Sequence, residues 1–585
     1  MVTQPRVRRV EIVAQDPSIR DRAGNIVIAT VSIPFEHLER GPQGFAVQVV
    51  DYDASSQTMY EPAEVPDDEL LKAPPSAEIL GNPKFHAINA YALVMRTLHR
   101  FEFALGRRVG WSTGGHQLKV VPHAFEQANA FYAEDAEALV FGYVRSRGAL
   151  TLFGLSHDVI VHETSHALID GIRDNFTKPS SPDQAALHEG LADVVALLSV
   201  FSLKDVLEPF IDEIPGQAGR RRRGPTSLLT KDDVTKDRLK QSVLLGLADE
   251  MRSESGDARV NALRRSVLID PSTTILERIE FEEPHRRGEV LVAAVLNAFL
   301  DTWVARIQDP GMSPLPTVSR TRVAEEGAAI ADVLLTMAIR ALDYTPPIHI
   351  EFGDYLSALI TGDVEVRSDD SRYDLRSRLL SSFKAYGIEP ASGTPDGTWQ
   401  RPSLKLRRDG AHFGSLQTDP TEVFRLVWSN REPLRIDPEA FTRITSVRPS
   451  FRVSPDDGFQ VRETVIECTQ YLKVPAPELG EYHLQRPDGM EDDFEVVLRG
   501  GSTLVLDEYG ELKYVVYQPI PTRGRTSPDR RARNQRRLDY LWQGGFLDAG
   551  ASLTQNLASL HRRRAMGAGA ASPPGQPTVR EESWT

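Results

Sequence analysis

The stretch VHETSHALID, residues 161–170, places two histidines four positions apart, with a glutamate directly after the first. On an α-helix, residues four apart lie one above the other on the same face, so His162 and His166 present two imidazoles to one point. Glu163 lies about 100° further around the helix and can reach a water at that point without ligating a metal. This HExxH spacing is typical of a zinc site with a general base.

The flanks of the motif favour a buried helix. DVIV precedes His162 and AL follows His166, so the helix is apolar on both sides of the two histidines. Burying histidine and glutamate in such surroundings without a partner is unfavourable. An ordinary helix with two incidental histidines is the alternative at this point, and further ligands from the rest of the chain have to decide between the two interpretations.

A second segment, HEGLADVVALLSVF (188–201), offers a further ligand. A catalytic zinc site usually has three protein ligands and one open position. Glu189 is the candidate third ligand. Asp193, four residues later on the same face, is placed to accept the distal N–H of a ligand histidine. His188 is expected to point to a different face and is the weaker alternative ligand, while His157 is expected at the surface or behind the ligands.

Composition and charge narrow the class of protein. The chain has 585 residues, a net charge of −14 and one cysteine, Cys468. The negative charge argues against general affinity for nucleic acids, and a single cysteine excludes an intrachain disulfide, so Cys468 is expected to be a reduced structural thiol. Neither a secretory signal nor a membrane-spanning run is recognised. We therefore expect a cytoplasmic protein, with signal-independent secretion as the alternative.

The order of the expected elements indicates an α+β fold, with the motif between a β-rich part and an α-rich part. A C-terminal region follows, in which VFRLVWS (423–429) is among the expected strands. The expected domains are an N-terminal β-rich region (1–80), a domain that carries the motif (85–390), a C-terminal β-rich domain (391–525), a basic helical segment (526–562) and a disordered tail (563–585).

Together, DVIVHETSHALID and HEGLADVVA resemble the thermolysin-like gluzincin metallopeptidases, and the resemblance covers residues 85–390. Upstream, residues 129–132 resemble the Asn-Ala-Phe-aromatic edge strand of that family. The resemblance implies that Asn129, Ala130 and Phe131 hold an extended substrate against this strand. It also implies a thermolysin-like catalytic domain in which the active-site helix lies between a β-rich lobe and an α-helical lobe.

Downstream, PHRRGEVLVAAVLNAFLDTW (284–303) resembles the family segment that carries a second catalytic histidine, and Gly288-Glu289-Val290 also matches the fungalysin branch. By this resemblance His285 would donate a hydrogen bond to the oxyanion of the reaction intermediate. Glu280 stands where the family tends to place an acidic partner of this histidine, and Glu282 and Glu283 compete for that role. The implied cofactor is one catalytic Zn²⁺, with Glu163 as general base and with His162, His166 and Glu189 as ligands.

The chain also departs from the family pattern. Thermolysin has an oxyanion-stabilising tyrosine between the second histidine and the third ligand, but residues 167–188 contain none, and Arg173 or Phe176 lies in that neighbourhood instead. Asp158 matches a calcium ligand of the family. Val200 stands where a second acidic ligand is expected, which puts the paired Ca²⁺ site in doubt.

Three functions remain open from the sequence. The first is a zinc-dependent metalloendopeptidase that acts on a peptide or protein, without a nucleic-acid or membrane partner. The second is a gluzincin aminopeptidase, whose Gly-x-Met-Glu-Asn motif we do not find. The third is a zinc-stabilised binding or regulatory protein on a peptidase scaffold, which would have no need of Glu163. The C-terminal region is a candidate site for a regulatory partner. The run Arg220–Arg223 is a candidate processing site, regulatory cleavage point or anion-binding loop, with a solvated flexible insertion as the alternative.

Overall fold

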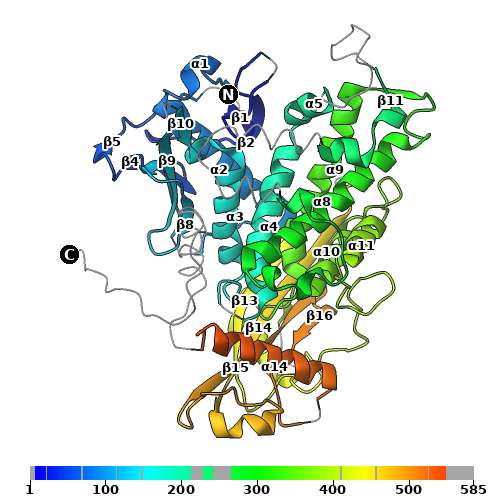
Figure 1. Ribbon diagram of the computed structural model, residues 1–585. Helices are drawn as coiled ribbons and strands as arrows, with labels where there is room; N and C mark the ends of the chain where they lie inside the picture. The colour runs from blue at the N-terminus through cyan, green and yellow to red at the C-terminus, as the bar shows by residue number, and fades with distance from the viewer. Residues whose placement is uncertain are drawn as a thin grey trace.

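The computed structural model describes residues 7–21, 23–67, 70–112, 115–146, 149–178, 180–212, 228–241, 265–408, 412–454, 457–524 and 526–547. Over these residues the protein is a mixed α+β structure with several sheets, 42% helical and 22% strand, which confirms the α+β prediction. Figure 1 shows the N-terminal strands on one side, the green helices on the other, and α3 and α4 between them. Residues 220–223, the disordered tail expected at 563–585 and the end of the expected basic segment lie outside the described residues.

Two sheets form the N-terminal side of the protein. In the first, β1 (Val7–Val13) pairs antiparallel with β2 (Ile28–Pro34) and parallel with β6 (Leu70–Leu71). The second has the order β10 (Ala149–Leu152), β9 (Ala138–Ser146), β7 (Leu118–Phe125) and β3 (Val47–Val49), and β8 (Ala130–Ala133) also pairs with β9. Since β3 comes from the first 80 residues, this sheet joins the expected N-terminal region to the rest of the fold. A small ribbon of β4 (Tyr52–Asp53) and β5 (Thr58–Met59) lies at its edge.

Long helices form the other side. They are α2 (Pro83–Leu105), α3 (His157–Ile172), α4 (Pro182–Phe201), α8 (Pro284–Gln308), α9 (Arg320–Arg340), α10 (Phe352–Val366) and α11 (Leu375–Ala385). Three of them begin with a capping residue followed by proline, at Asn82, Ser181 and Glu283, whose side chains accept hydrogen bonds from backbone N–H groups of the first turn. Proline suits the first helical position because its missing N–H would have no partner there.

One hydrophobic core joins the strands and the helices, from Val10 to Ile388, and it includes Val505 and Tyr514 of the C-terminal sheet. Among the described helices, α4 and α8 are long and apolar enough to cross a membrane, but 94% and 72% of their most apolar windows are buried inside the protein. Buried core helices pass the same test, so this finding is weak.

A four-stranded antiparallel sheet dominates the C-terminal region. Its strands are β13 (Phe441–Val453), β14 (Gln460–Pro475), β15 (Glu495–Leu506) and β16 (Leu512–Gln518). The prediction of a strand at residues 423–429 is wrong, because this stretch belongs to helix α13 (Pro420–Ser429). Asp419 and Pro420 start that helix, and Val423, Leu426 and Val427 bury one helical face, which outweighs the β-branched and aromatic content.

Buried ion pairs join the C-terminal sheet to the rest of the protein. Arg173, directly after α3, donates to Glu467 of β14 and to the Thr345 hydroxyl at 2.9 Å. Asp343, which follows α9, pairs with both Arg107 and Arg452 of β13. Leaving one partner of a buried pair without the other is strongly destabilising. The end of α3 therefore depends on the C-terminal sheet.

Helix α14 (Pro528–Gln543) forms part of the expected basic segment and docks on the first turn of α10. Arg537 is buried there and donates to Glu351 at 3.1 Å and to Gln518 at 3.2 Å. Asp354 lies beside it and accepts from the Glu351 backbone N–H at 2.9 Å and from the Gln518 amide at 3.0 Å. Burial, and then the charge of Glu351, raises the pKa of Asp354 to about 7, although Arg537 and Arg533 oppose this shift.

We expect Asp354→Asn to stabilise the protein at pH 8 and to have little effect near pH 4. The folded state keeps the Asp354 proton to about pH 7, whereas an unfolded chain releases it near pH 4, so the unfolding free energy falls as pH rises through this window. The difference between the two proteins should approach but not exceed about 4 kcal/mol at pH 8. Thermal unfolding of both proteins across the window measures it. The exposed Asp488→Asn serves as control, and a difference that does not change with pH would contradict the expectation.

Candidate active site

Helices α3 and α4 bring the three predicted metal ligands together. His162 and His166 lie on one face of α3 with their Nε2 atoms 2.8 Å apart. The Glu189 carboxylate of α4 faces them, with Oε2 3.7 Å from His162 Nε2 and Oε1 3.7 Å from His166 Nε2. All three side chains are buried, and one ligand atom from each lies within 4.8 Å of the others. The arrangement can hold one metal ion.

Each histidine of this group contacts a further side chain through its other ring nitrogen. Asp193 Oδ1 lies 2.8 Å from His162 Nδ1, which is the contact that the sequence predicts. His188 Nδ1 lies 2.8 Å from His166 Nδ1, and the two rings stack at 4.6 Å. His188 therefore contacts the ring nitrogen of His166 that does not face Glu189, and it is not part of the three-residue ligand group. The packing of α4 on α3 brings it there, which helix periodicity alone does not reveal.

Glu163 is fully buried and contacts the sheet beside α3. Its Oε2 accepts a hydrogen bond from the backbone N–H of Tyr132 in β8 at 2.9 Å. Among the described strands, β8 pairs with β9 alone, so it is an edge strand, as the resemblance implies. Ala130 and Phe131 lie in β8, and Asn129 directly precedes it. The edge strand and the predicted general base are thus in direct contact.

His285 reaches the group from the first turn of α8. Its Nε2 lies 3.4 Å from Glu189 Oε2, and its Nδ1 lies 2.6 Å from Glu283 Oε1. Burial alone would raise the pKa of Glu283, but the hydrogen bond and charge of His285 outweigh it and lower this pKa to about 2. The carboxylate that the structure places on His285 is therefore Glu283, whereas the sequence favoured Glu280.

A sequence signal for Glu283 was available. Pro284 marks the first helical position of α8, which makes the preceding residue the N-cap. A capping side chain bends back toward the backbone N–H groups of the first turn, and Glu283 accepts from those of His285 and Arg286 at 3.1 and 2.8 Å. The same bend places its carboxylate beside the His285 ring.

The remaining sequence candidates lie away from the metal ligands or have structural contacts. His157 is buried, and its Nε2 lies 3.0 Å from Ser199 Oγ, so the expectation of a surface position is wrong. Burial lowers its pKa well below the ordinary value. Phe176 is buried in the core, and Arg173 pairs with Glu467 as described above. Val200 is also buried, and a valine cannot supply the second acidic ligand of the family's Ca²⁺ site.

Helices α4 and α8 cross at two glycines next to the site. A Cβ atom on Gly288 would lie 2.9 Å from the carbonyl oxygen of Ala186 and 3.0 Å from the backbone nitrogen of Gly190. A Cβ on Gly190 would lie 2.9 Å from the carbonyl oxygen of Gly288. Backbone atoms cannot rotate away as a side chain can. The close crossing therefore fixes the distance between Glu189 and His285.

We expect Gly288→Ala to separate the two helices by a few tenths of an ångström or more and to weaken the site. Overpacking of this kind typically destabilises by about 1–3 kcal/mol, and the His285–Glu189 distance should lengthen. Thermal unfolding and metal affinity measure these effects. Gly480→Ala is the control, because a Cβ there meets no atom within 4 Å. Equal stability and metal affinity in wild type and Gly288→Ala would show that the crossing has no such role.

Comparison with family models and with curated proteins adds no relative. No family model matches the chain, and no curated protein matches it. The likeness to thermolysin-like peptidases therefore rests on the residues and contacts described above.

Proposed function

We propose that this protein is a zinc-dependent metalloendopeptidase with a thermolysin-like catalytic domain. The observation that carries the proposal is the convergence on one point of side chains from three helices. His162 and His166 come from α3, Glu189 from α4 and His285 from α8. Glu163, on the motif helix, contacts an edge strand beside them. A purely structural metal site needs the three ligands His162, His166 and Glu189, but it needs neither His285 nor the buried carboxylate of Glu163.

The donor set fits zinc. Two imidazole nitrogens and one carboxylate oxygen form one of the known protein ligand sets of catalytic Zn²⁺. Asp193 holds His162 through Nδ1, and His188 contacts Nδ1 of His166, so both rings direct Nε2 to the ligand group. Such outer contacts fix the tautomer and the ring orientation of a ligand histidine. The chemistry that zinc supplies when bound is a lower pKa of water and a polarised substrate carbonyl.

Glu163 is proposed as the general base. Its Oε2 is held by the Tyr132 N–H, which leaves the carboxylate fixed in orientation beside the two histidines. In this position it can take a proton from the attacking water and pass it to the leaving amine. General acid–base catalysis of this type contributes about 10²- to 10⁴-fold to the rate.

His285 is proposed to stabilise the oxyanion. The Nδ1 atom of His285 contacts Glu283, and an N–H group at Nε2 would donate a hydrogen bond to a negative oxygen. Glu283 is ionised at neutral pH because its pKa is lowered to about 2. With Nδ1 held by Glu283, the Nε2 atom of His285 faces the ligand group, and the residue is proposed to take over part of the stabilisation that the family assigns to a tyrosine.

The edge strand β8 is proposed to align the substrate. An extended peptide can add to a sheet edge through main-chain hydrogen bonds. Asn129, Ala130 and Phe131 lie at this edge, next to the strand residue that contacts Glu163. The peptide bond to be cleaved would then lie along the strand and across the predicted base.

Mapping of new N-termini in a proteome digested with the full-length protein tests the proposal. We expect internal cleavages that require zinc and that are absent with Glu163→Gln. Removal of single N-terminal residues would instead indicate an aminopeptidase. Zinc binding without cleavage of any protein would indicate a binding or regulatory protein, and either result would overturn the proposal.

A further inference from the structure

Tyr132 joins three parts of the site region through its backbone and its side chain. Its backbone N–H donates to Glu163 Oε2 at 2.9 Å, and its hydroxyl lies 3.4 Å from Asp170 Oδ2. The same hydroxyl makes a short hydrogen bond with the Ser112 hydroxyl. Tyr132 and Asp170 are both more than nine-tenths buried. A single residue of the edge strand thus contacts two carboxylates of α3.

The two carboxylates lie on one face of the motif helix. Glu163 and Asp170 are seven residues apart, about two turns, so both point toward β8. Burial raises the pKa of Asp170 to about 6, and the charge of Glu134 adds to this, whereas hydrogen bonds from Ser112, Tyr132 and Thr177 oppose it. A buried carboxyl is unfavourable unless hydrogen bonds compensate for its desolvation. The hydroxyls of Tyr132 and Ser112 provide that compensation here.

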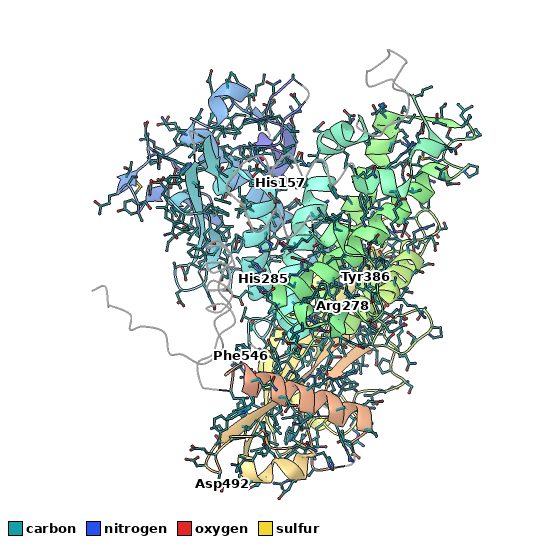
Figure 2. All side chains as sticks on the ribbon, viewed as in Figure 1. His157, Arg278, His285, Tyr386, Asp492 and Phe546 are labelled. Atoms are coloured by element: carbon teal, nitrogen blue, oxygen red, sulfur yellow. The ribbon has the colours of Figure 1, made fainter. Side chains whose placement is uncertain are left out.

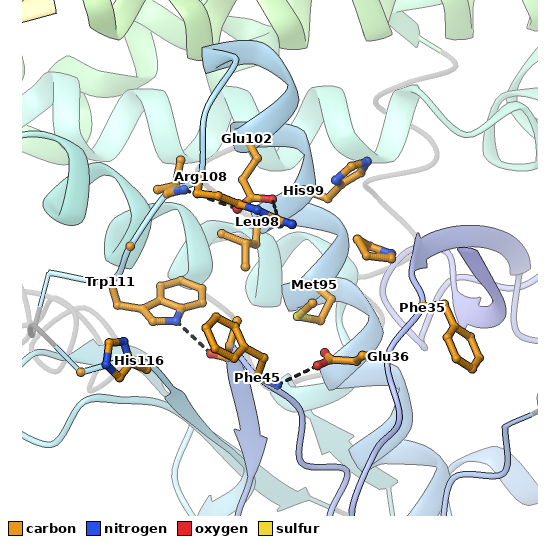
Figure 3. Close-up of a pocket in the computed structure, with 15 residues that line it drawn as sticks. Phe35, Glu36, Phe45, Met95, Leu98, His99, Glu102, Arg108, Trp111 and His116 are labelled. Atoms are coloured by element: carbon orange, nitrogen blue, oxygen red, sulfur yellow. Dashed lines mark hydrogen bonds and ion pairs between the residues drawn. The ribbon is translucent and has the colours of Figure 1, made fainter. Parts of the chain in front are cut away.

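Ser112 is itself held firmly by its neighbours. The indole N–H of the adjacent Trp111 donates to the carbonyl oxygen of Ala46 at 2.9 Å (Figure 3). On the other side, a Cβ on Gly171 of α3 would lie 2.3 Å from the carbonyl oxygen of Gly110 and 3.1 Å from the Ser112 nitrogen. The segment of residues 110–112 is therefore in close contact with the last turn of α3. Its position fixes the Ser112 hydroxyl against the end of the Tyr132 side chain.

We propose that Ser112, Tyr132 and Asp170 form a positioning bridge that holds edge strand β8 on the predicted general base. The contacts with Ser112 and Asp170 fix the position of the Tyr132 side chain. The fixed side chain in turn keeps the Tyr132 backbone N–H in its hydrogen bond with Glu163. The bridge acts on the reaction without touching the substrate or the metal. The inference rests on the proposed peptidase function for its kinetic part. Its structural part, the hold on the Tyr132 N–H, stands independently. Figure 2 labels His285, in the first turn of α8, which marks the site region in the whole protein.

Two substitutions of equal size at Ser112 test the bridge in the full-length protein. Ser112→Thr keeps the hydroxyl, and Ser112→Val replaces it with a methyl group. A misplaced catalytic group costs up to about 100-fold in rate. We expect Ser112→Val and Tyr132→Phe to lower kcat by about 10-fold or more at temperatures at which both variants are fully folded, with KM and zinc content close to wild type. Ser112→Thr should retain the wild-type kcat.

Hydrogen-exchange mass spectrometry of peptides that cover β8 provides a readout without substrate. We expect the amide of Tyr132 to exchange faster in Ser112→Val than in Ser112→Thr. If the wild type cleaves no peptide, the proposed function fails while this measurement still tests the bridge. Unchanged exchange in Ser112→Val, or equal kcat in the Val and Thr variants, would overturn the inference. So would a loss of kcat that merely follows a loss of Tm, because that result would indicate structural support alone.

Discussion

Glu163→Gln is expected to bind zinc as the wild type does and to lose peptide hydrolysis. The amide keeps an oxygen that can accept from the Tyr132 N–H, so the contact with β8 and the fold should persist. It cannot take a proton from water, and we expect kcat to fall by about 10²- to 10⁴-fold. Zinc analysis and steady-state cleavage of a peptide library measure the two properties on the same sample.

Glu280→Gln is the matched control for this experiment. Glu280 is exposed, whereas Glu163 is fully buried. We expect the control to retain wild-type kcat, which would also agree with the assignment of Glu283 as the carboxylate partner of His285. A Glu163→Gln protein that cleaves peptides at the wild-type rate would refute the mechanism. A protein that loses zinc together with activity would show that Glu163 acts on the metal site.

Removal of zinc is expected to abolish activity and to lower the thermal stability of the protein. Two imidazoles and a carboxylate lie buried, with one ligand atom from each within 4.8 Å of the others. A bound cation stabilises such a group, because it compensates the buried negative charge. A ligand present at about 1,000 times its Kd stabilises the folded state by about 4 kcal/mol. Chelation followed by calorimetry and by addition of one equivalent of Zn²⁺ should show the loss of both properties and then their recovery.

His166→Ala tests the same point without a chelator. We expect this variant to lose most of its zinc, and Glu189→Ala to do the same, because a site with two protein ligands left is weak. The exposed His412→Ala is the control and should keep zinc, activity and Tm. Full activity after chelation, or normal zinc content in His166→Ala, would contradict the proposed metal site.

The sequence predicted the parts of the site that depend on helix geometry. His162, Glu163 and His166 share one helix, and their relative directions follow from 3.6 residues per turn. The i, i+4 spacing of Glu189 and Asp193 likewise places both on one face of α4, and the structure brings both to the histidines. Local rules suffice here because each pair lies within one regular element.

Contacts between elements were harder to predict. Glu283, and not Glu280, contacts His285, although the N-cap and proline pattern contained the necessary signal. No sequence spacing reveals that His188 stacks on His166 or that the Tyr132 N–H donates to Glu163. These contacts join separate helices and strands, so they depend on how the elements pack.

The sequence by itself determined which residues can bind metal and carry protons, since residue type and helical period set both the chemistry and the direction of each side chain. The tertiary structure decided which of them meet. The glycine crossing of α4 and α8 sets the distance from Glu189 to His285. Arg173 reaches Glu467, far along the chain, and ties the end of the motif helix to the C-terminal sheet. Close packing and buried charge pairs act across long sequence separations, so the complete fold is needed to define them.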